Sequence, residues 1–434
     1  MTYRLLLSVA VIGSILLSAP AASPRAFVKV KNHRFYVGGR QYYFIGANYW
    51  YGGLLGLEKG KKRGVERLRR ELDFLRVHGV TNLRLLAGAE GTGVMNGVTR
   101  VGPPLQPGSG NFDLSVLDGL DLVLYEMGKR GMRAVIFLSN NWEWSGGFQQ
   151  YLIWNRVISD KWLEQKPSWD ELRDNVARFY SCRPCTDGYK AQVRLILSHR
   201  NKYSGKRYVD DPAIMAWELA NEPRPMRPAA VEDYRRWISE SAAMIRAADR
   251  NHLVTIGHEG WIGTQDVALY EAINADENVD YLTIHIWPKN WGWFTTGKMA
   301  ADSSNIVAET EKYISENLAV ARKLDKPLVI EEFGLPRDAQ SFDPKASTVQ
   351  RDAYYKTVLS FVGPRQPGSD LIGGANFWAF GGTARPISGQ VFWKSGDELM
   401  GDPPMEEQGL NSVFDSDLTT WKVIRSAAQS VAGK

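Results

Sequence analysis

The chain has 434 residues and a formal net charge of +5, with 44% hydrophobic, 23% charged and 11% aromatic residues. These values are ordinary for a globular protein, and the length suits two average domains or one large barrel with long insertions. The charge is small for this length, and we interpret the short basic cluster at 59–63 as the solvated start of a helix. Nucleic acid is therefore not an expected partner.

The N-terminus predicts an export signal. Arg4 precedes the apolar run 5–17, and small residues follow at 19–22. A basic start, an apolar core too short to span a bilayer dependably and a small-residue cleavage site are typical of a secretory signal peptide. An uncleaved membrane anchor is the alternative. We expect residues 1–22 to be a signal peptide, 23–434 to form a single domain, and the mature protein to be secreted (extracellular or periplasmic) without membrane association.

Beyond this segment, strand-like apolar runs alternate with amphipathic helical stretches. Runs at 27–30 and 42–45 flank a turn at 37–40, which predicts an N-terminal β-hairpin. The predicted strands are Phe44–Asn48, Asn82–Leu86, Ala134–Ser139, Ile214–Asn221, Leu253–Gly257, Tyr281–Ile286, Leu328–Glu332 and Ala375–Ala379. Helical patterns lie between them, for example at Val65–His78, Leu114–Arg130, Glu232–Asp249, Asn305–Leu324 and Thr348–Phe361.

This alternation predicts an α/β fold, a (β/α)8 TIM barrel with the N-terminal hairpin as its floor. A doubly wound open sheet is the alternative, but no Gly-rich phosphate loop follows the first strand. Four long segments each follow a strand and precede a helix, so they belong at the C-terminal face of the barrel, where active sites are built. We expect them to form an open substrate cleft; they are 88–112, 140–168, 287–303 and 380–416.

The long loops and strand ends hold many of the fifteen tryptophans. Trp217 and Trp237 are expected in the core. A tryptophan in a polar loop needs a packing partner and an acceptor for its N–H, so stacking on pyranose rings explains the loop tryptophans better than core packing does. The loop set comprises Trp50, Trp142, Trp144, Trp154, Trp162, Trp261, Trp287, Trp291, Trp293, Trp378 and Trp393.

The chain has two cysteines, Cys182 and Cys185. In an exported protein a small local disulfide loop is the expected state. Zinc would need further ligands with similar spacing, and none is nearby. A redox role is disfavoured because the pair does not sit at the start of a helix that follows a strand.

Two apolar runs of strand length, 215–223 and 329–334, end on glutamate and are cut off by Pro or Gly. An acid at the C-terminal tip of a buried strand is where a parallel α/β protein keeps its chemistry. Strand alternation puts Glu218 and Glu222 on one side of the first run and Asn221 on the other. Glu222 stands at the tip, whereas Glu218 lies deeper and needs a cation.

Arg84, near the end of the predicted strand 82–86, could pair with Glu218 or reach the active-site carboxylate itself. Of Glu331 and Glu332, alternation allows only one to face the centre. Glu332 is nearer the tip and is the predicted site residue, and its neighbour is an expected ion-paired structural residue. Two carboxyl groups can hydrolyse a glycoside with retention when about 5–5.5 Å separates them, and with inversion across a wider gap.

His285 ends another predicted strand beside the aromatic Trp287, where it could orient a carboxylate or serve the structure alone. Together with Glu222 and Glu332 it could in principle ligate a metal. The chain has no closely spaced His/Asp set, so neither a metal nor a cofactor is expected.

These strand ends together resemble glycoside hydrolase family 5. The resemblance lies in Asn221-Glu222-Pro223, Glu332-Phe333-Gly334, Arg84, His285-Ile286-Trp287 and Trp378. Within the family, the stretches 43–52, 140–142 with 146–147, 217–224 and 284–288 are similar to endo-β-1,4-mannanases. The resemblance extends from about Phe27 to the C-terminus.

The resemblance implies a retaining double displacement with Glu222 as the acid/base and Glu332 as the nucleophile. It implies that Asn221 hydrogen-bonds the 2-hydroxyl of the sugar at the −1 subsite, the position of the sugar that is attacked. Trp378 would form the platform under that sugar.

The remaining implied roles surround this pair. Arg84 and His285 would hold the nucleophile ionised and oriented, Arg224 would bind a sugar on the leaving-group side, and Trp142 would shape the cleft. Many family members carry a tyrosine two residues after the histidine, donating to the nucleophile, and this chain has Trp287 there. An indole can donate one N–H but cannot replace a phenol in other respects.

The leading hypothesis is a secreted, monomeric endo-β-1,4-mannanase that hydrolyses mannan, glucomannan or galactomannan with retention and without a cofactor. An endo-β-1,4-glucanase is the nearest alternative, because the two sugars differ only at C2. An alternative of another class is a non-catalytic β-glycan-binding protein on the same scaffold.

Overall fold

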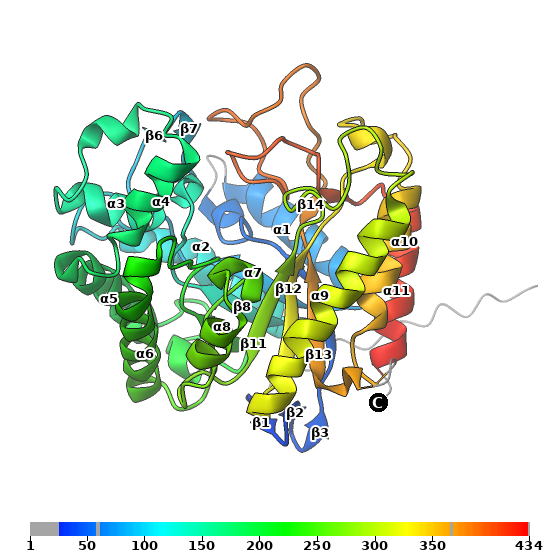
Figure 1. Ribbon diagram of the computed structural model, residues 1–434, viewed down its shortest axis with the longest axis horizontal. Coiled ribbons are helices and arrows are strands. Elements are labelled where there is room, and N and C mark those ends of the chain that lie inside the picture. Colours follow the sequence, from blue (N-terminus) through cyan, green and yellow to red (C-terminus); the bar gives the residue numbers. More distant parts are fainter. Residues whose placement is uncertain (1–25, 58–60, 365–367, 433–434) are drawn as a thin grey trace, which may run out of the picture.

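The computed structural model describes residues 26–57, 61–364 and 368–432. The predicted signal peptide, residues 1–22, lies outside the described residues. Eight parallel strands form the central sheet, in the order β10-β9-β8-β5-β4-β13-β12-β11, with helices around it (Figure 1). The strands are β4 (Phe44–Asn48), β5 (Val80–Leu86), β8 (Arg133–Phe137), β9 (Ile214–Glu218), β10 (Leu253–Thr255), β11 (Leu282–Ile286), β12 (Leu328–Phe333) and β13 (Ile372–Phe377).

Backbone hydrogen bonds between the segments around β10 and β11 bring the two ends of this sheet together. The amide of Asp280 donates to the carbonyl of Val254 over 2.8 Å, and the amide of His285 donates to the carbonyl of Glu259 over 2.9 Å. The eight predicted strands and the (β/α)8 barrel are confirmed. The strands are buried along their length, which is typical of a parallel sheet with a packed interior and a layer of helices outside.

The helices follow the predicted pattern and surround the barrel (Figure 1). They are α1 (Lys61–Val77), α2 (Leu117–Lys129), α3 (Gly147–Trp154), α4 (Trp169–Ala177), α5 (Arg183–Ser198), α6 (Val231–Ala248), α7 (Trp261–Thr264), α8 (Val267–Asn274), α9 (Ser303–Leu324), α10 (Val349–Ser360) and α11 (Leu418–Val431). In the described part of the chain, no helix combines the length and the apolar character that crossing a bilayer requires.

The floor of the barrel is a three-stranded antiparallel sheet rather than the predicted hairpin. Its strands are β1 (Val28–Lys31), β2 (Arg34–Val37) and β3 (Arg40–Gln41), and Gly38 and Gly39, both at positive φ, make the turn between the last two. Phe35 packs edge-on against Tyr281, and a Cβ at Gly373 would lie 2.3 Å from the Phe35 ring. The sheet therefore seals the barrel bottom at a point where only glycine fits.

The long segments lie at the opposite end, beyond the C-terminal ends of the strands, as predicted (Figure 1). They contain short elements of their own: β6 (Val94–Met95) pairs with β7 (Val98–Thr99), and β14 (Phe380–Gly382) pairs with β15 (Val413–Phe414). A buried glutamate, Glu90, anchors the first of these loops, because it accepts hydrogen bonds from Ser139, Gln192 and the amide of Gly147. Burial raises its pKa to about 7.

Cys182 and Cys185 form the predicted local disulfide. Cys182 is the N-cap of α5, so the pair stands at the start of a helix. The element before it is α4 and not a strand, so the pattern still differs from a thioredoxin-like one. The disulfide links the N-cap of α5 to the first turn of the same helix.

Candidate active site

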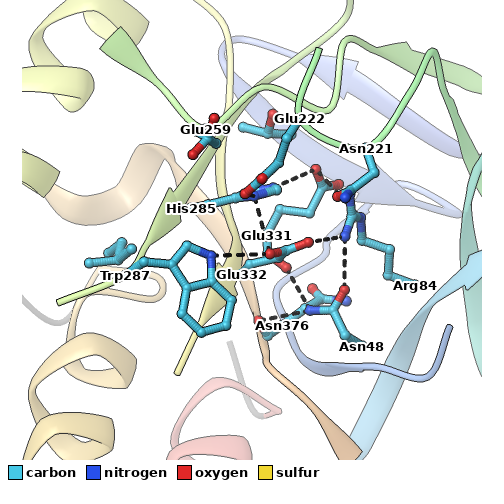
Figure 2. A network of polar contacts seen from close by, with 12 residues as sticks. Asn48, Arg84, Asn221, Glu222, Glu259, His285, Trp287, Glu331, Glu332 and Asn376 are labelled. Atoms are coloured by element: carbon cyan, nitrogen blue, oxygen red, sulfur yellow. Dashed lines mark hydrogen bonds and ion pairs between the residues drawn. The ribbon is translucent and has the colours of Figure 1, made fainter. Parts of the chain in front are cut away.

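The strand ends bring four acids, an arginine and a histidine together at the centre of the barrel. Figure 2 labels all of these residues except the deepest acid. Arg84 extends from β5, Glu218 from β9, His285 from β11, and Glu331 and Glu332 from β12. All are at most 2% exposed. Glu222 follows the tip of β9 and completes the group.

The chain bends at Glu222 in a way that strand alternation does not anticipate. The β9 ladder ends at Glu218, and Glu222 has a φ of +52°, which is rare for a residue other than glycine. The amide of Glu222 still donates to the carbonyl of Gly257 over 2.9 Å. Because of this left-handed turn, Asn221 and Glu222 both point into the site, and the prediction that they face opposite ways is wrong.

A β-bulge in β12 explains a second departure from alternation. Opposite β11, Ile284 pairs with Ile330 and His285 pairs with Glu332, so Glu331 is the extra residue. A bulge turns a side chain that regular pleating would send outward. Glu331 and Glu332 therefore both face the barrel interior, where alternation had allowed only one.

Arg84 links the acids to one another. Its guanidinium donates to Glu218 over 2.6 and 2.8 Å and to the side-chain oxygen of Asn221 over 2.7 Å. It also donates to Glu332 and, over 3.0 Å, to Asn48. The sequence left open whether Arg84 pairs with Glu218 or with the active-site carboxylate. In the structure it pairs with both Glu218 and Glu332.

Glu331 is paired only loosely by comparison. Its Oε2 lies 3.8 Å from Arg84 Nε and 3.8 Å from His285 Nε2. Within the described residues, the two carboxylate oxygens of Glu331 have no hydrogen-bond partner, and His285 Nε2 has none either. Glu331 is therefore buried with ion-pair contacts to two cationic side chains, and its predicted role as an ion-paired residue is confirmed.

Glu332 accepts hydrogen bonds from two sides. In addition to Arg84, the indole N–H of Trp287 donates to its Oε2 over 3.3 Å, so the tryptophan supplies a donor where the family often has a tyrosine. Burial raises the pKa of Glu332 to about 7, against the opposing effect of the positive charges of His285 and Arg84.

Glu222 is held by His285 and Trp142. Its Oε1 lies 2.6 Å from His285 Nδ1, and its Oε2 accepts the Trp142 indole N–H over 2.6 Å. Burial acts to raise the pKa of Glu222, but these bonds and the charges of His285 and Arg224 outweigh it and lower the pKa to about 2. Burial likewise opposes charge on His285, yet the surrounding carboxylates raise its pKa to about 10, which makes it a cation at neutral pH.

Beyond Glu222, Arg224 forms the next wall of the site. Its guanidinium donates to both oxygens of Glu259, over 2.5 and 2.6 Å, and lies 5.0 Å from the centre of the Trp142 ring. Glu259 is not among the site residues predicted from the sequence. This acid follows the predicted strand 253–257 within two residues. The expectation that acids at the C-terminal ends of buried strands carry the chemistry would therefore have identified it.

A cavity of about 530 Å³ opens over these groups, a size typical of ligand pockets. Of the predicted site residues, Trp142, Asn221, Glu222, Arg224, Trp287, Glu332 and Trp378 line it. Arg84 and His285 lie beneath and reach it through the carboxylates. Trp144 and Trp291 also line the cavity, whereas Trp50 is buried and donates to the carbonyl of Gly401, which makes it a core residue rather than a sugar platform. Trp217 and Trp237 are buried as predicted.

Glu222, His285 and Glu332 also have the spacing of a metal-ligand set, with one donor atom from each lying within 4.8 Å of the others. The same His285 Nδ1 already lies at 2.6 Å from Glu222 and 3.3 Å from Glu332. A proton on this nitrogen bridges the carboxylates, and a metal would have to replace that proton. The hydrogen bonds therefore fit proton chemistry better than metal binding.

Comparison with known proteins agrees with this geometry. A family model described as "GH family 5 beta-mannosidase-like" matches residues 25–434. The chain is 31% identical over 369 residues to mannan endo-1,4-beta-mannosidase 1 of Oryza sativa subsp. japonica, covering 81% of this chain and 78% of the relative. The glycoside hydrolase family 5 mannosidase of Rhizomucor miehei superimposes with a TM-score of 0.83 at 30% identity, covering 94% of this chain and 98% of that one.

An endo-beta-1,4-mannanase of Thermotoga petrophila shares the fold, with a TM-score of 0.64 at 23% identity over 91% of this chain and 78% of that one. The family match spans the barrel and every residue of the cavity described above. The chain is therefore a glycoside hydrolase and belongs to the β-mannosidase-like members of glycoside hydrolase family 5.

Proposed function

We propose that this glycoside hydrolase is an endo-acting β-1,4-mannanase that cleaves mannan, glucomannan or galactomannan with retention. The separation of the two acids is the observation that carries the retaining part. Carboxylate oxygens of Glu222 and Glu332 lie within 4.8 Å of each other. Retaining enzymes hold their carboxyl groups about 5–5.5 Å apart, and inverting ones about 6.5–9.5 Å apart to admit a water.

In the proposed reaction, an oxygen of Glu332 attacks the anomeric carbon while the glycosidic C–O bond breaks. The proton of Glu222 goes to the departing oxygen. Glu222 then accepts a proton from a water, the water oxygen attacks the same carbon, and Glu332 leaves as a carboxylate. Arg84 and Trp287 stabilise Glu332 as the carboxylate through the N–H donors already aimed at it.

This reaction needs the proton on Glu222, whereas the empty site favours it on Glu332. Burial raises the pKa of Glu332, whereas His285 lowers the pKa of Glu222, because it lies 2.6 Å from Glu222 but 3.3 Å from Glu332. Two coupled carboxyl groups titrate as a unit, so bound substrate can move one proton between them. A glycosidic oxygen against Glu222 accepts its proton, and positive charge that develops at the anomeric carbon favours the carboxylate of Glu332.

The sugar preference is proposed from the relatives. Curated relatives from rice are named mannan endo-1,4-beta-mannosidases, and a variant of the Rhizomucor miehei mannosidase is described in complex with mannosyl-fructose. The open cavity lined by tryptophans suits the apolar faces of pyranose rings but does not distinguish the two configurations at C2. An endo-β-1,4-glucanase therefore remains the alternative.

Release of reducing ends from purified mannan and from carboxymethylcellulose tests the proposal. We expect activity on mannan and its loss in Glu332→Ala, with the thermal unfolding curve unchanged in shape. Activity on cellulose alone would replace the mannanase by the glucanase. Activity on neither polymer would favour a non-catalytic glycan-binding protein.

Glu222→Ala tests the acid role separately. The variant should lose far more rate on mannan than on an aryl β-mannoside with a good leaving group, because only the former needs protonation of the departing oxygen. Equal losses on both substrates would contradict the assignment of Glu222.

We propose further that the protein is secreted and acts as a monomer. The N-terminal pattern of residues 1–22 supports export, and a single chain holds both proposed catalytic acids together with the side chains that bind them. N-terminal sequencing of the secreted protein and its elution volume in size-exclusion chromatography test these two points. An intact N-terminus, or elution as a dimer, would contradict them.

A further inference from the structure

A second cavity adjoins the catalytic one on the side of Arg224. It has a volume of about 280 Å³, and Trp169, Arg224 and Gln265 line both cavities. None of the proposed catalytic steps uses it. Because the two cavities have walls in common, a linear ligand that passes Arg224 can enter the second one without leaving the surface of the protein.

Trp169 stands at the junction of the two cavities. It is 50% exposed, which is unusual for so large an apolar side chain, and it stacks on Trp142 with ring centres 6.2 Å apart and 26° between the planes. Trp142 donates to the proposed acid Glu222, so the two rings form a path that leads outward from the reacting bond. The Arg224 guanidinium lies 5.0 Å from one ring centre and 6.0 Å from the other.

The walls of the second cavity are held in place before any ligand arrives. Trp169 begins α4 directly after a capping box formed by Ser168 and Glu171, which fixes its backbone. Across the cavity, Gln265 and Met226 have φ values of +58° and +64°. Left-handed residues other than glycine persist where the surrounding structure imposes them, and they cluster at ligand sites.

Polar groups complement the exposed ring. Arg173 lines the second cavity; its Nε donates to the carbonyl of Met226 over 3.0 Å, and its Nη1 lies 3.5 Å from Asp170. A guanidinium has five N–H donors, so donors beyond these two contacts are left for a ligand. The Gln265 amide can both donate and accept. An apolar ring flanked by an amide and a guanidinium matches a hydroxylated pyranose, which has an apolar face and a polar rim.

We propose that the second cavity binds the distal part of the leaving-group end of a β-1,4-mannan chain, with Trp169 as its stacking platform. The inference rests on the proposed function and on the assignment of Arg224 to the leaving-group side. It adds a binding site beyond the catalytic cavity. It predicts that long chains are cut faster than short ones because they reach Trp169 and stack on its ring.

The test compares substrates that do and do not reach Trp169. The ratio of kcat/KM for mannohexaose to kcat/KM for an aryl β-mannobioside is measured in the wild type and in Trp169→Ala. Loss of one stacked aromatic contact should lower this ratio roughly tenfold. Hydrolysis of mannohexaose in isotopically labelled water, read by mass spectrometry, should show cleavage moving toward the reducing end, because chains no longer gain by extending past Arg224.

Two further variants separate binding from folding. Gln265→Gly removes the amide at a position where its left-handed backbone suits glycine, and it should lower the same ratio in the same direction. Tyr203→Ala removes another exposed aromatic ring, 44% exposed and stacked on Tyr125 away from both cavities, and it should leave the ratio unchanged.

An unchanged ratio and an unchanged cleavage pattern in Trp169→Ala would overturn this inference while the mannanase proposal stands. A wild-type protein that cleaves no manno-oligosaccharide would overturn both. A ratio that falls equally in Tyr203→Ala would show an effect that is not specific to the second cavity, and it would also reject the role of Trp169.

Discussion

Glu331→Gln removes a buried charge beneath the two proposed catalytic acids with little change of shape. Glu331 Oε2 lies 3.8 Å from His285 Nε2, and both atoms are buried. A pair of unit charges at this distance contributes about 4 kcal/mol at an effective dielectric constant of about 20. Since one pKa unit corresponds to about 1.4 kcal/mol, the pKa of His285 should fall by about 3 units. Its starting value is about 10, so the variant should titrate near neutral pH.

The measurement is a nitrogen NMR titration of protein labelled in its six histidines, with His285→Asn identifying the resonance. Wild-type His285 should keep both ring protons through neutral pH, whereas the variant should lose one there. Glu218→Gln is the matched control, because burial raises the pKa of Glu218 to about 8 and the substitution therefore changes little charge at neutral pH. A variant His285 that stays doubly protonated above about pH 9 would refute the reasoning.

Three further predictions follow from the contacts of single residues. Burial raises the pKa of Glu90 from 4.5 to about 7, so the folded protein should lose about 3 kcal/mol of stability as the pH rises across this window, and Glu90→Gln should lack that slope in urea unfolding. Trp287→Phe removes a donor to Glu332 and should lower kcat on mannan roughly 10- to 100-fold with the fold retained; an unchanged kcat would contradict the role of the indole. The double variant Cys182→Ser, Cys185→Ser should lose about 2 kcal/mol of stability, seen as a lower Tm, while kcat stays within experimental error of the wild type.

Most of the fold could be predicted from the sequence because hydrophobic periodicity is a local property. Each barrel strand is a short apolar run between turn signals, and each helix has one apolar face. The N-terminal floor was predicted less well. The run at 42–45 reads as the second strand of a hairpin, but residues from Phe44 onward belong to the barrel, and the short β3 takes the place beside β2.

The site departs from prediction where the backbone is irregular. Alternation is valid only within a regular ladder, and it failed at the left-handed turn of Glu222 and at the bulge of Glu331. No signal in the residue types indicated either feature, because glutamate is not a usual residue for positive φ. Both irregularities bring an additional polar side chain into the centre, Asn221 in one case and Glu331 in the other.

Other features depend on contacts between segments far apart in the chain. The cavity that Trp169 and Gln265 line joins the start of α4 to the end of α7, and no motif in either segment indicates that the two meet. The Arg224–Glu259 pair joins the ends of two neighbouring strands, so it follows from the barrel order once that order is known. A single sequence places residues on elements, but it does not show which loops meet across the cleft.

The stereochemistry of the first product tests the central claim most directly. Mannohexaose is hydrolysed in an NMR tube, and the anomeric signals are recorded before mutarotation mixes them. A two-glutamate retaining mannanase predicts that the newly formed reducing end appears first as the β-anomer. An initial α-anomer, or the absence of any hydrolysis of this substrate, would contradict the proposed function.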